Sequence, residues 1–276
     1  MKIQAPSHPL VGTKLARMRR MGHRGKVILP HRAIGQLDSP AARLAIGGGI
    51  AGLFTLALLA LRGPIAAGWS ATLVSWLQTL NLAGLNVIAA APAEDWMSLS
   101  LPTIELPLLP PESGIPVLQV GLIVACWWLA GRLPDAAKPG AYLLRFAALI
   151  HGLSIAYFSL WPGSFLHSLP EHTGNGFRQT WALMLLTPWI HVATYYVFPF
   201  PLRHGLLLTL LTLAYLLVLT PLQYASHAAL LYHLGLVFMP LFYLLFGAML
   251  SILGFVALYG WAMSWSAASV DDGDLL

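Results

Sequence analysis

Long apolar runs separated by short polar breaks dominate this chain. Helices of about 20 apolar residues are needed to cross a bilayer at 1.5 Å per residue. Five runs predict one transmembrane helix each, at residues 44–62, 116–131, 141–161, 180–200 and 205–222. A further run, 228–266, is about twice as long as one span. We therefore expect an all-α polytopic membrane protein with six or seven transmembrane helices.

The run at 228–266 fits three arrangements. They are one long helix kinked at Pro240, two spans with a tight turn near Gly247 or Gly254, and one span followed by a surface helix that carries Trp261 and Trp265. The acidic tail at 267–276 does not choose between them, because Asp has little influence on topology.

The segment 69–90 has a different pattern, with polar and apolar residues on opposite halves of a helical wheel. Trp69, Leu73 and Trp76 share the apolar half. Tryptophan favours the boundary between headgroups and hydrocarbon. The sequence thus predicts an amphipathic helix that lies on the membrane surface.

The segment 91–114 is rich in proline, which excludes a helix there. Polar and apolar residues alternate from Thr103 to Leu106, which predicts a short edge strand. Extended chain is not tolerated in contact with lipid tails. We therefore expect residues 63–115 to form a cap on the extracytoplasmic side of the bundle at 44–266.

The charges predict the orientation of the chain. Of the 276 residues, 58% are hydrophobic and only 9% are charged, and nine of the 15 Lys and Arg residues precede residue 44. With the N-terminus in the cytoplasm and 69–90 on the surface, thirteen basic residues lie on the cytoplasmic side and two, Arg62 and Arg178, outside. This positive-inside bias favours a multi-pass protein of the bacterial inner membrane.

The basic tail at 1–43 also bears on the class of partner. Despite the net charge of +5, a basic tail beside a membrane helix is typical of contact with anionic lipid headgroups. We expect protein partners within the membrane and no nucleic acid. The single cysteine, Cys126, cannot form an internal disulfide.

The stretch SFLHSLPEHTGNGFRQ, residues 164–179, is the most polar part of the chain after the N-terminal tail. Pro170, Gly174 and Gly176 predict a non-helical hairpin between two spans. Its His-x-x-x-Glu-His spacing differs from the helical His-x-x-Glu-His zinc signature, so no metal site is expected.

This hairpin nevertheless contains the best candidates for contact with a ligand or a partner. They are His167, Glu171, His172 and Arg178, which His227 can approach from the later span. Together they predict a polar patch on the outer face. The alternative is a solvated loop with interfacial histidines.

Two further histidines, His151 and His191, lie near the middle of consecutive predicted spans. Ionisable groups at that depth are costly and are often functional. Facing imidazoles can hold a haem iron, relay protons or contact a quinone. The alternative is a neutral histidine that is hydrogen-bonded to a neighbouring Ser, Thr or Tyr, and the sequence specifies no cofactor.

Absent patterns narrow the function. The chain contains no Walker A loop, no Gly-x-Ser-x-Gly elbow and no His-Glu-x-x-His motif, and its predicted spans contain no Asp or Glu. The sequence favours a non-catalytic subunit or assembly factor of a bacterial envelope or secretion complex. The alternative is a small membrane enzyme or a haem or quinone redox subunit, acting through the outer patch or the His151 and His191 pair.

Overall fold

A computed structural model describes residues 41–82, 84, 86–89, 101–108, 116–161, 167–197 and 202–268. The chain separates into two compact units, Met1–Pro40 and Ala41–Leu276, and every described residue belongs to the second. The basic and acidic tails expected from the sequence lie outside the described residues, except for their innermost positions.

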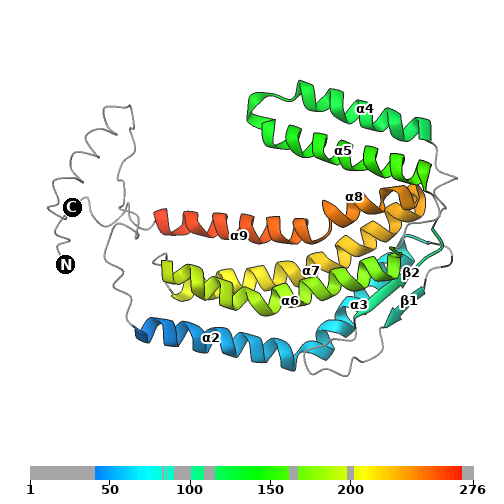
Figure 1. Ribbon diagram of the computed structural model, residues 1–276. Coiled ribbons are helices and arrows are strands. Elements are labelled where there is room, and N and C mark those ends of the chain that lie inside the picture. The colour runs from blue at the N-terminus through cyan, green and yellow to red at the C-terminus, as the bar shows by residue number, and fades with distance from the viewer. Residues whose placement is uncertain are drawn as a thin grey trace, which may run out of the picture. The chain divides into compact units, whose positions relative to one another are not determined.

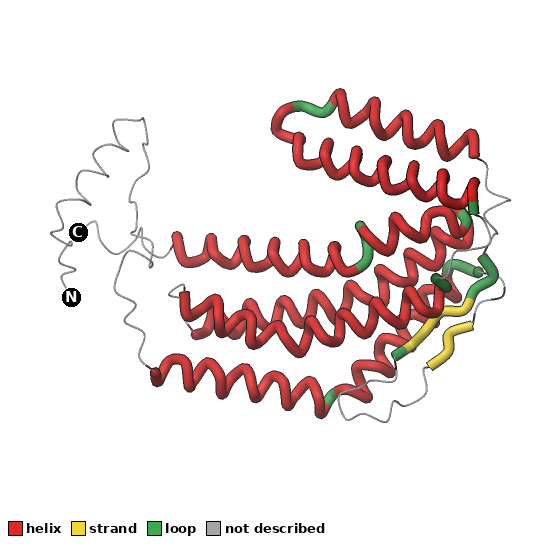
Figure 2. The backbone as a smooth tube through the Cα atoms, viewed as in Figure 1, coloured by secondary structure: helices red, strands yellow, loops and turns green. Residues whose placement is uncertain are grey.

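The second unit is built mainly of helices (Figures 1 and 2). The α-helices are α2 (Ala41–Ala60), α3 (Arg62–Thr79), α4 (Pro116–Arg132), α5 (Lys138–Leu160), α6 (Leu169–Val197), α7 (Leu202–Leu234), α8 (Met239–Leu244) and α9 (Ala248–Ala268). Two 3₁₀ turns, η2 (Asp135–Ala137) and η3 (Leu236–Phe238), precede α5 and α8. The strands are β1 (Asn86–Ala89) and β2 (Pro102–Glu105).

Helices α6 and α7 form the centre of the unit, with α2 packed on α6 and α3 packed on α7. Helix α4 packs on α5, and this hairpin contacts the rest mainly where α5 meets η3 and α8. Figure 1 shows the α4–α5 hairpin beside α8 and the two strands at the same end of the unit.

The bounds expected for the surface helix at 69–90 are wrong. Helix α3 begins at Arg62, follows α2 after a bend of 59°, and ends at Thr79. It ends there because Asn81 and Gly84 have positive φ angles of 51° and 76°, which a helix does not allow. The chain then continues as β1.

Part of the apolar half of α3 packs against protein, whereas Trp76 of the same half is 48% exposed. Trp69, Leu73 and Leu77 are buried in the core that α3 shares with α7. The indole Nε1 of Trp69 donates a hydrogen bond to the Leu217 carbonyl at 2.8 Å. This bond leaves no polar atom of the buried indole without a partner.

The strand expected near Thr103 is confirmed. Strands β1 and β2 pair antiparallel, with Asn86 opposite Glu105 and Ala89 opposite Pro102. The backbone N–H of Ile104, which faces away from β1, donates to Thr173 Oγ1 of α6 at 3.2 Å. The free edge of this small sheet is thereby anchored to a helix.

The expected non-helical hairpin at 164–179 is wrong from Leu169 onward, because α6 begins there. Pro170 is tolerated since the first helical turn needs no N–H donor from it. Gly174 and Gly176 lie inside α6, at positions where other residues approach the helix closely. A Cβ on Gly174 would lie 3.2 Å from Thr103 Cγ2, and one on Gly176 would overlap the phenol ring of Tyr224. Residues 162–166 lie outside the described part.

None of the three arrangements expected for residues 228–266 matches the structure by itself. Helix α7 continues through Pro221 to Leu234, beyond the boundary expected at 222. The chain turns at Gly235, whose φ is 86°, and breaks again at Gly247 between α8 and α9. The turn expected near Gly247 is thus present, whereas Pro240 lies in the first turn of α8, where proline is tolerated.

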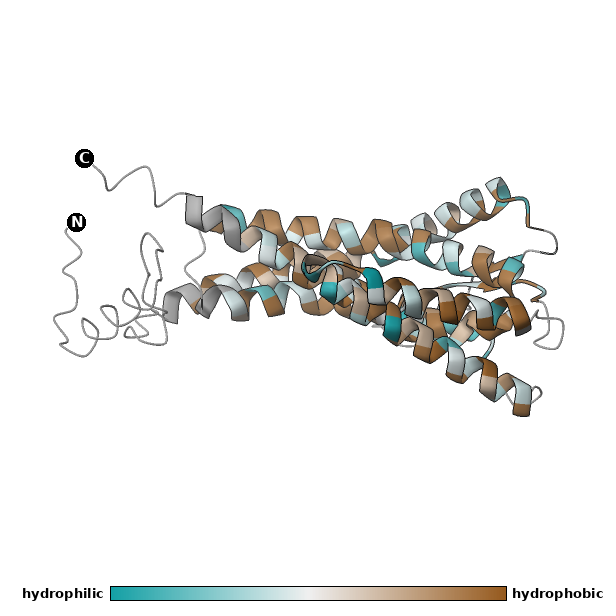
Figure 3. Cartoon of the chain, turned by 90° about the horizontal axis from the view of Figure 1, so that it is seen from above, coloured by the Kyte–Doolittle hydropathy of each residue, from teal (hydrophilic) through white to brown (hydrophobic). Residues whose placement is uncertain are grey.

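The helices identify a membrane-embedded protein. Within the described residues, three are long and apolar enough to cross a bilayer: Asp135–Leu160, Leu202–Leu234 and Leu236–Ala262. The bent α2–α3 pair passes the same test as one broken span, and Val117–Arg132 is apolar but shorter. Figure 3 shows hydrophobic residues along most of the helical surface. A total of six or seven spans stays a prediction.

Candidate functional site

Two histidines from different helices meet near the first turns of α6. His172 Nε2 lies 3.2 Å from His227 Nδ1 of α7, and the two rings are stacked at 5.4 Å between centroids. Both side chains are buried, with exposures of 4% and 3%. The structure therefore brings together two of the residues that the sequence placed in one outer patch.

Aromatic rings surround this histidine pair. The ring of Tyr224 meets both imidazoles edge-on. Phe242 stacks on His227. The ring centroid of Tyr243 in α8 lies 5.7 Å from that of His172. The surrounding rings exclude water from the imidazoles and fix their orientation. The hydrogen bond between the two imidazoles is thus a specified contact of the fold.

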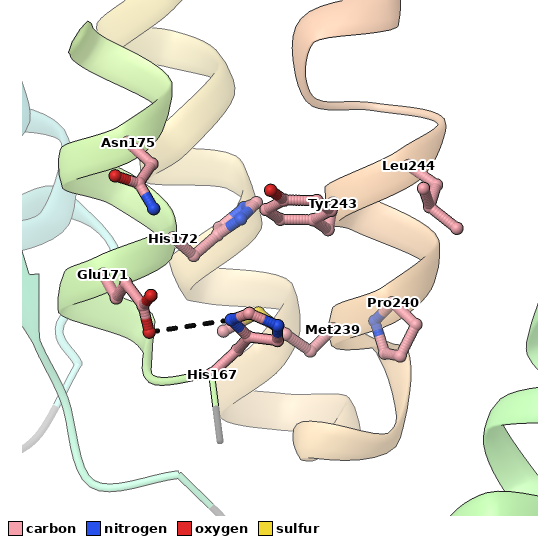
Figure 4. A pocket seen from close by; sticks show the side chains of 8 residues that line it. All are labelled: His167, Glu171, His172, Asn175, Met239, Pro240, Tyr243 and Leu244. Carbon is pink, nitrogen blue, oxygen red and sulfur yellow. Dashed lines mark ion pairs between the residues drawn. The ribbon is translucent and has the colours of Figure 1, made fainter. Parts of the chain in front are cut away.

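A cavity of about 150 Å³ lies next to His172, between α6 and α8 (Figure 4). Its lining consists of His167, Glu171, His172, Asn175, Met239, Pro240, Tyr243 and Leu244. At its rim, His167 Nδ1 and Glu171 Oε2 are 3.6 Å apart, and both side chains are exposed. In Figure 4, His172 and Tyr243 point toward one another from opposite sides.

One polar atom of this site has no partner. His172 Nδ1 is buried and makes no hydrogen bond to any described group. A neutral imidazole has one N–H and one acceptor nitrogen, so Nδ1 is an acceptor if Nε2–H donates to His227, and a donor if His227 Nδ1–H donates to Nε2. Buried polar atoms are normally paired. This nitrogen is thus a buried polar atom without a hydrogen bond among the described residues.

Burial, reinforced by the neighbouring His167, lowers the pKa of His172 from 6.5 to about 4. His172 lies in the first turns of α6, outside the helices that meet the membrane criteria. Its imidazole is accordingly neutral at pH 7, which leaves both hydrogen-bonding modes of Nδ1 open.

This low pKa predicts acid sensitivity. As the pH falls below 6.5, the unfolded chain binds a proton at His172 that the folded chain binds only near pH 4. The contribution of His172 to stability is thus complete above pH 6.5 and falls by about 2 kcal/mol at pH 5. Thermal unfolding in detergent at pH 8 and pH 5 measures this loss.

In this experiment His172→Phe should reduce the difference in unfolding temperature between the two pH values. The matched control His233→Phe changes an exposed histidine of α7 and should leave that difference unchanged. An equal pH dependence in His172→Phe and the unmodified protein would contradict the assignment.

The other predicted residues divide between the site and its surroundings. His167 and Glu171 line the cavity, whereas Arg178 is exposed and donates from Nη1 to Asn175 Oδ1 at 2.9 Å. Sequence reasoning missed the opposite wall, which α8 forms with Met239, Pro240, Tyr243 and Leu244. The only sequence feature that indicates this wall is Gly235, because the turn there brings α8 back toward α6.

His151 and His191 have separate surroundings. His151 of α5 stacks on Phe238, and neither of its ring nitrogens has a hydrogen-bond partner within the described residues. His191 Nδ1 lies 2.9 Å from Thr209 Oγ1, and its ring stacks on Phe255. The hydrogen bond to a threonine corresponds to the neutral alternative considered for these residues.

Within the part of the chain that the structure describes, no three His, Cys, Asp or Glu residues are close enough together to hold a metal ion. Cys126 is a half-buried free thiol in α4.

Together, the fold and the cavity define a helical membrane protein with a small polar site near one end of its central helices. No protein-family model, no curated protein and no solved structure matches the chain.

Proposed function

We propose that this protein is a non-catalytic subunit or assembly factor of an envelope or secretion complex in the bacterial inner membrane. The observation that carries this proposal is the large unburied share of its apolar helices. Only 28% of the most apolar window in Asp135–Leu160 and 24% of that in Leu236–Ala262 is buried within the unit, against 44% for Leu202–Leu234. Such helices offer wide surfaces to neighbouring proteins or lipid.

The α4–α5 hairpin is the strongest part of this argument. Helix α4 packs chiefly on α5, and Val117, Trp127 and Trp128 are exposed on it, with Val117 82% exposed. Small residues on the same helix, such as Gly121 and Gly131, leave open space where another helix can approach closely.

The orientation of the chain in the membrane is part of this proposal. With the N-terminal tail in the cytoplasm, the positive-inside bias puts α3, the two strands and the start of α6 on the outer side. The six or seven spans of this proposal include the last apolar run. Anionic lipid headgroups would bind the basic tail.

Site-specific photo-crosslinking in native membranes tests the proposal. A benzoylphenylalanine probe at Val117 or Trp128 should form a discrete adduct with the same partner protein from both positions. A probe at Ala148, which is buried in α5, is the matched control and should form none. Adducts with lipid alone at both exposed positions would contradict a role as a subunit.

A second candidate function is supported by the buried pair of His172 and His227, because His172 also lines a cavity. It is a small membrane enzyme or redox subunit that uses the outer patch. Such an enzyme or redox subunit would have to bind a ligand in the cavity.

A further inference from the structure

The turn that joins α4 to α5 carries positive charge that no described acid balances. Arg132 ends α4, Lys138 begins α5, and Arg145 lies two turns further along α5. Lys138 is paired with Asp135 at 3.0 Å, whereas neither arginine makes an ion pair with a carboxylate of the described residues. We call this part of the hairpin, which Figure 1 shows at the end away from α8, the cationic end.

Two exposed tryptophans of α4 accompany the two arginines. The guanidinium carbon of Arg132 lies 3.8 Å from the ring centroid of Trp128, and that of Arg145 lies 5.8 Å from the ring centroid of Trp127. Both indoles are about half exposed, at 57% for Trp128 and 52% for Trp127. A cation–π contact orients a guanidinium group but does not neutralise its charge. Both arginines are therefore held in place and still lack an anion.

The depth of Arg145 gives this missing anion its importance. Arg145 lies about 10 Å along α5 from Lys138, inside the segment Asp135–Leu160 that is apolar enough to cross a membrane. An arginine at such a depth is costly unless it meets an anion or extends to the level of the headgroups, where exposed tryptophans also lie. Its Nε is buried without a hydrogen bond, so an anion would meet the terminal nitrogens of the guanidinium.

An apolar stripe runs along α5 from the cationic end. Tyr142, Phe146, Leu149 and Leu153 follow the i, i+4, i+7, i+11 spacing of one helix face, and between 49% and 65% of each residue is exposed. The stripe is about 16 Å long at helical rise. Positive charge beside a long apolar stripe matches an amphiphile with an anionic head and a hydrocarbon chain better than it matches a soluble anion.

We propose that the cationic end of the α4–α5 hairpin binds the phosphate of an anionic glycerophospholipid, with one acyl chain of that lipid along the apolar stripe of α5. The phosphate oxygens accept charge-assisted hydrogen bonds from Arg132 and Arg145. A zwitterionic lipid fits less well, because its ammonium group returns a positive charge to the two arginines. The residues of this site are distinct from the basic tail at 1–43.

Photo-crosslinking in lipid nanodiscs tests this inference on the purified full-length chain, without partner proteins. Benzoylphenylalanine replaces Tyr142, and the nanodiscs contain equal amounts of phosphatidylglycerol and phosphatidylcholine with the same acyl chains. Each basic residue near a membrane surface contributes about fivefold to the affinity for an anionic lipid. Mass spectrometry should therefore show phosphatidylglycerol adducts enriched by about 5- to 25-fold at Tyr142. A probe at Val117, at the opposite end of α4, is the matched control and should show no enrichment.

Charge variants assign the enrichment to the two arginines. Arg145→Gln should lower the enrichment at the Tyr142 probe about fivefold, and Arg132→Gln combined with Arg145→Gln should abolish it. Arg178→Gln removes one positive charge from α6 and should leave the enrichment unchanged. Arg132 is exposed at the end of its helix, so Arg132→Gln alone should fold normally and still lower the enrichment. The unfolding temperature in phosphatidylcholine alone confirms that each variant is folded.

Several results would overturn the proposal. Equal yields of the two lipids at Tyr142 would show that no anionic lipid is selected, and undiminished enrichment in the double arginine variant would assign the selection to charges elsewhere in the chain. Loss of the enrichment on addition of inorganic phosphate at constant ionic strength would identify a site for soluble phosphate. A protein adduct at Tyr142 in native membranes that Arg145→Gln abolishes would identify a partner carboxylate as the anion. Crosslinking from Val117 in native membranes tests the subunit proposal separately.

Discussion

Replacing Trp69 by alanine is expected to lower the free energy of unfolding by about 3–5 kcal/mol. Trp69 is only 1% exposed, lies between α3 and α7, and packs on Phe177 of α6 with ring centroids 5.1 Å apart. Its removal leaves a cavity that three helices line, and it also removes the donor to the Leu217 carbonyl. Reversible unfolding in a mixed detergent system, followed by circular dichroism, measures the loss.

The same helix supplies a matched control. Trp76 is 48% exposed, and Trp76→Ala should change the free energy of unfolding by less than about 0.5 kcal/mol. Trp69→Phe retains most of the ring and should be intermediate, because it loses the hydrogen bond but leaves a smaller cavity. Similar losses from Trp69→Ala and Trp76→Ala would show that α3 does not pack as described.

Replacing Gly176 by valine is expected to cost about 3 kcal/mol or more, because a Cβ there would overlap the phenol ring of Tyr224. Tyr224 is buried and cannot swing aside freely, since the rings of His172, Phe177 and His227 pack against it. The substitution should also broaden or shift the NMR signals of the two imidazoles. Thermal unfolding measures the cost.

Gly49→Val is the control for this prediction, because Gly49 also lies inside a helix but meets no atom within 4 Å. Gly49→Val should leave the free energy of unfolding almost unchanged. Combining Gly176→Val with Tyr224→Ala should cost less than the sum of the two single changes, since the second change removes the ring that the valine strikes. Additive losses would mean that the valine is accommodated elsewhere.

The class of fold was predictable because the apolar runs are long and the charges are few. Helices α2, α4 and α5 fall within a few residues of the expected runs, and the strand at Thr103 follows its alternating pattern. These features depend on local sequence, where the periodicity of the chain directly reports which positions face apolar surroundings.

The helical start of α6 was not predictable, because glycine is common where helices end. Gly174 and Gly176 instead lie where α6 approaches β2 and Tyr224 most closely. In a single sequence, a glycine required by a close contact looks the same as a glycine required by a turn. Only the positions of the neighbouring elements distinguish them.

The site was predictable in part. His167, Glu171 and His172 are close in sequence, so their grouping needs only one helical turn or loop. The hydrogen bond between His172 and His227 joins residues 55 positions apart, and the wall formed by α8 depends on the turn at Gly235. Such long-range contacts arise from packing, which a hydropathy pattern does not encode.

The bond between the Trp69 indole and the Leu217 carbonyl has a consequence for how the chain is made. The two residues are 148 positions apart. At synthesis rates of about 5–20 residues per second this separation takes about 7–30 seconds, during which α3 has left the ribosome but its partner helix does not yet exist. Through this interval the buried face of α3 needs lipid, the insertion machinery or a chaperone to cover it. Early truncation, or a slow codon run before α7, would prolong this exposure and send more of the newly made chain to membrane proteases.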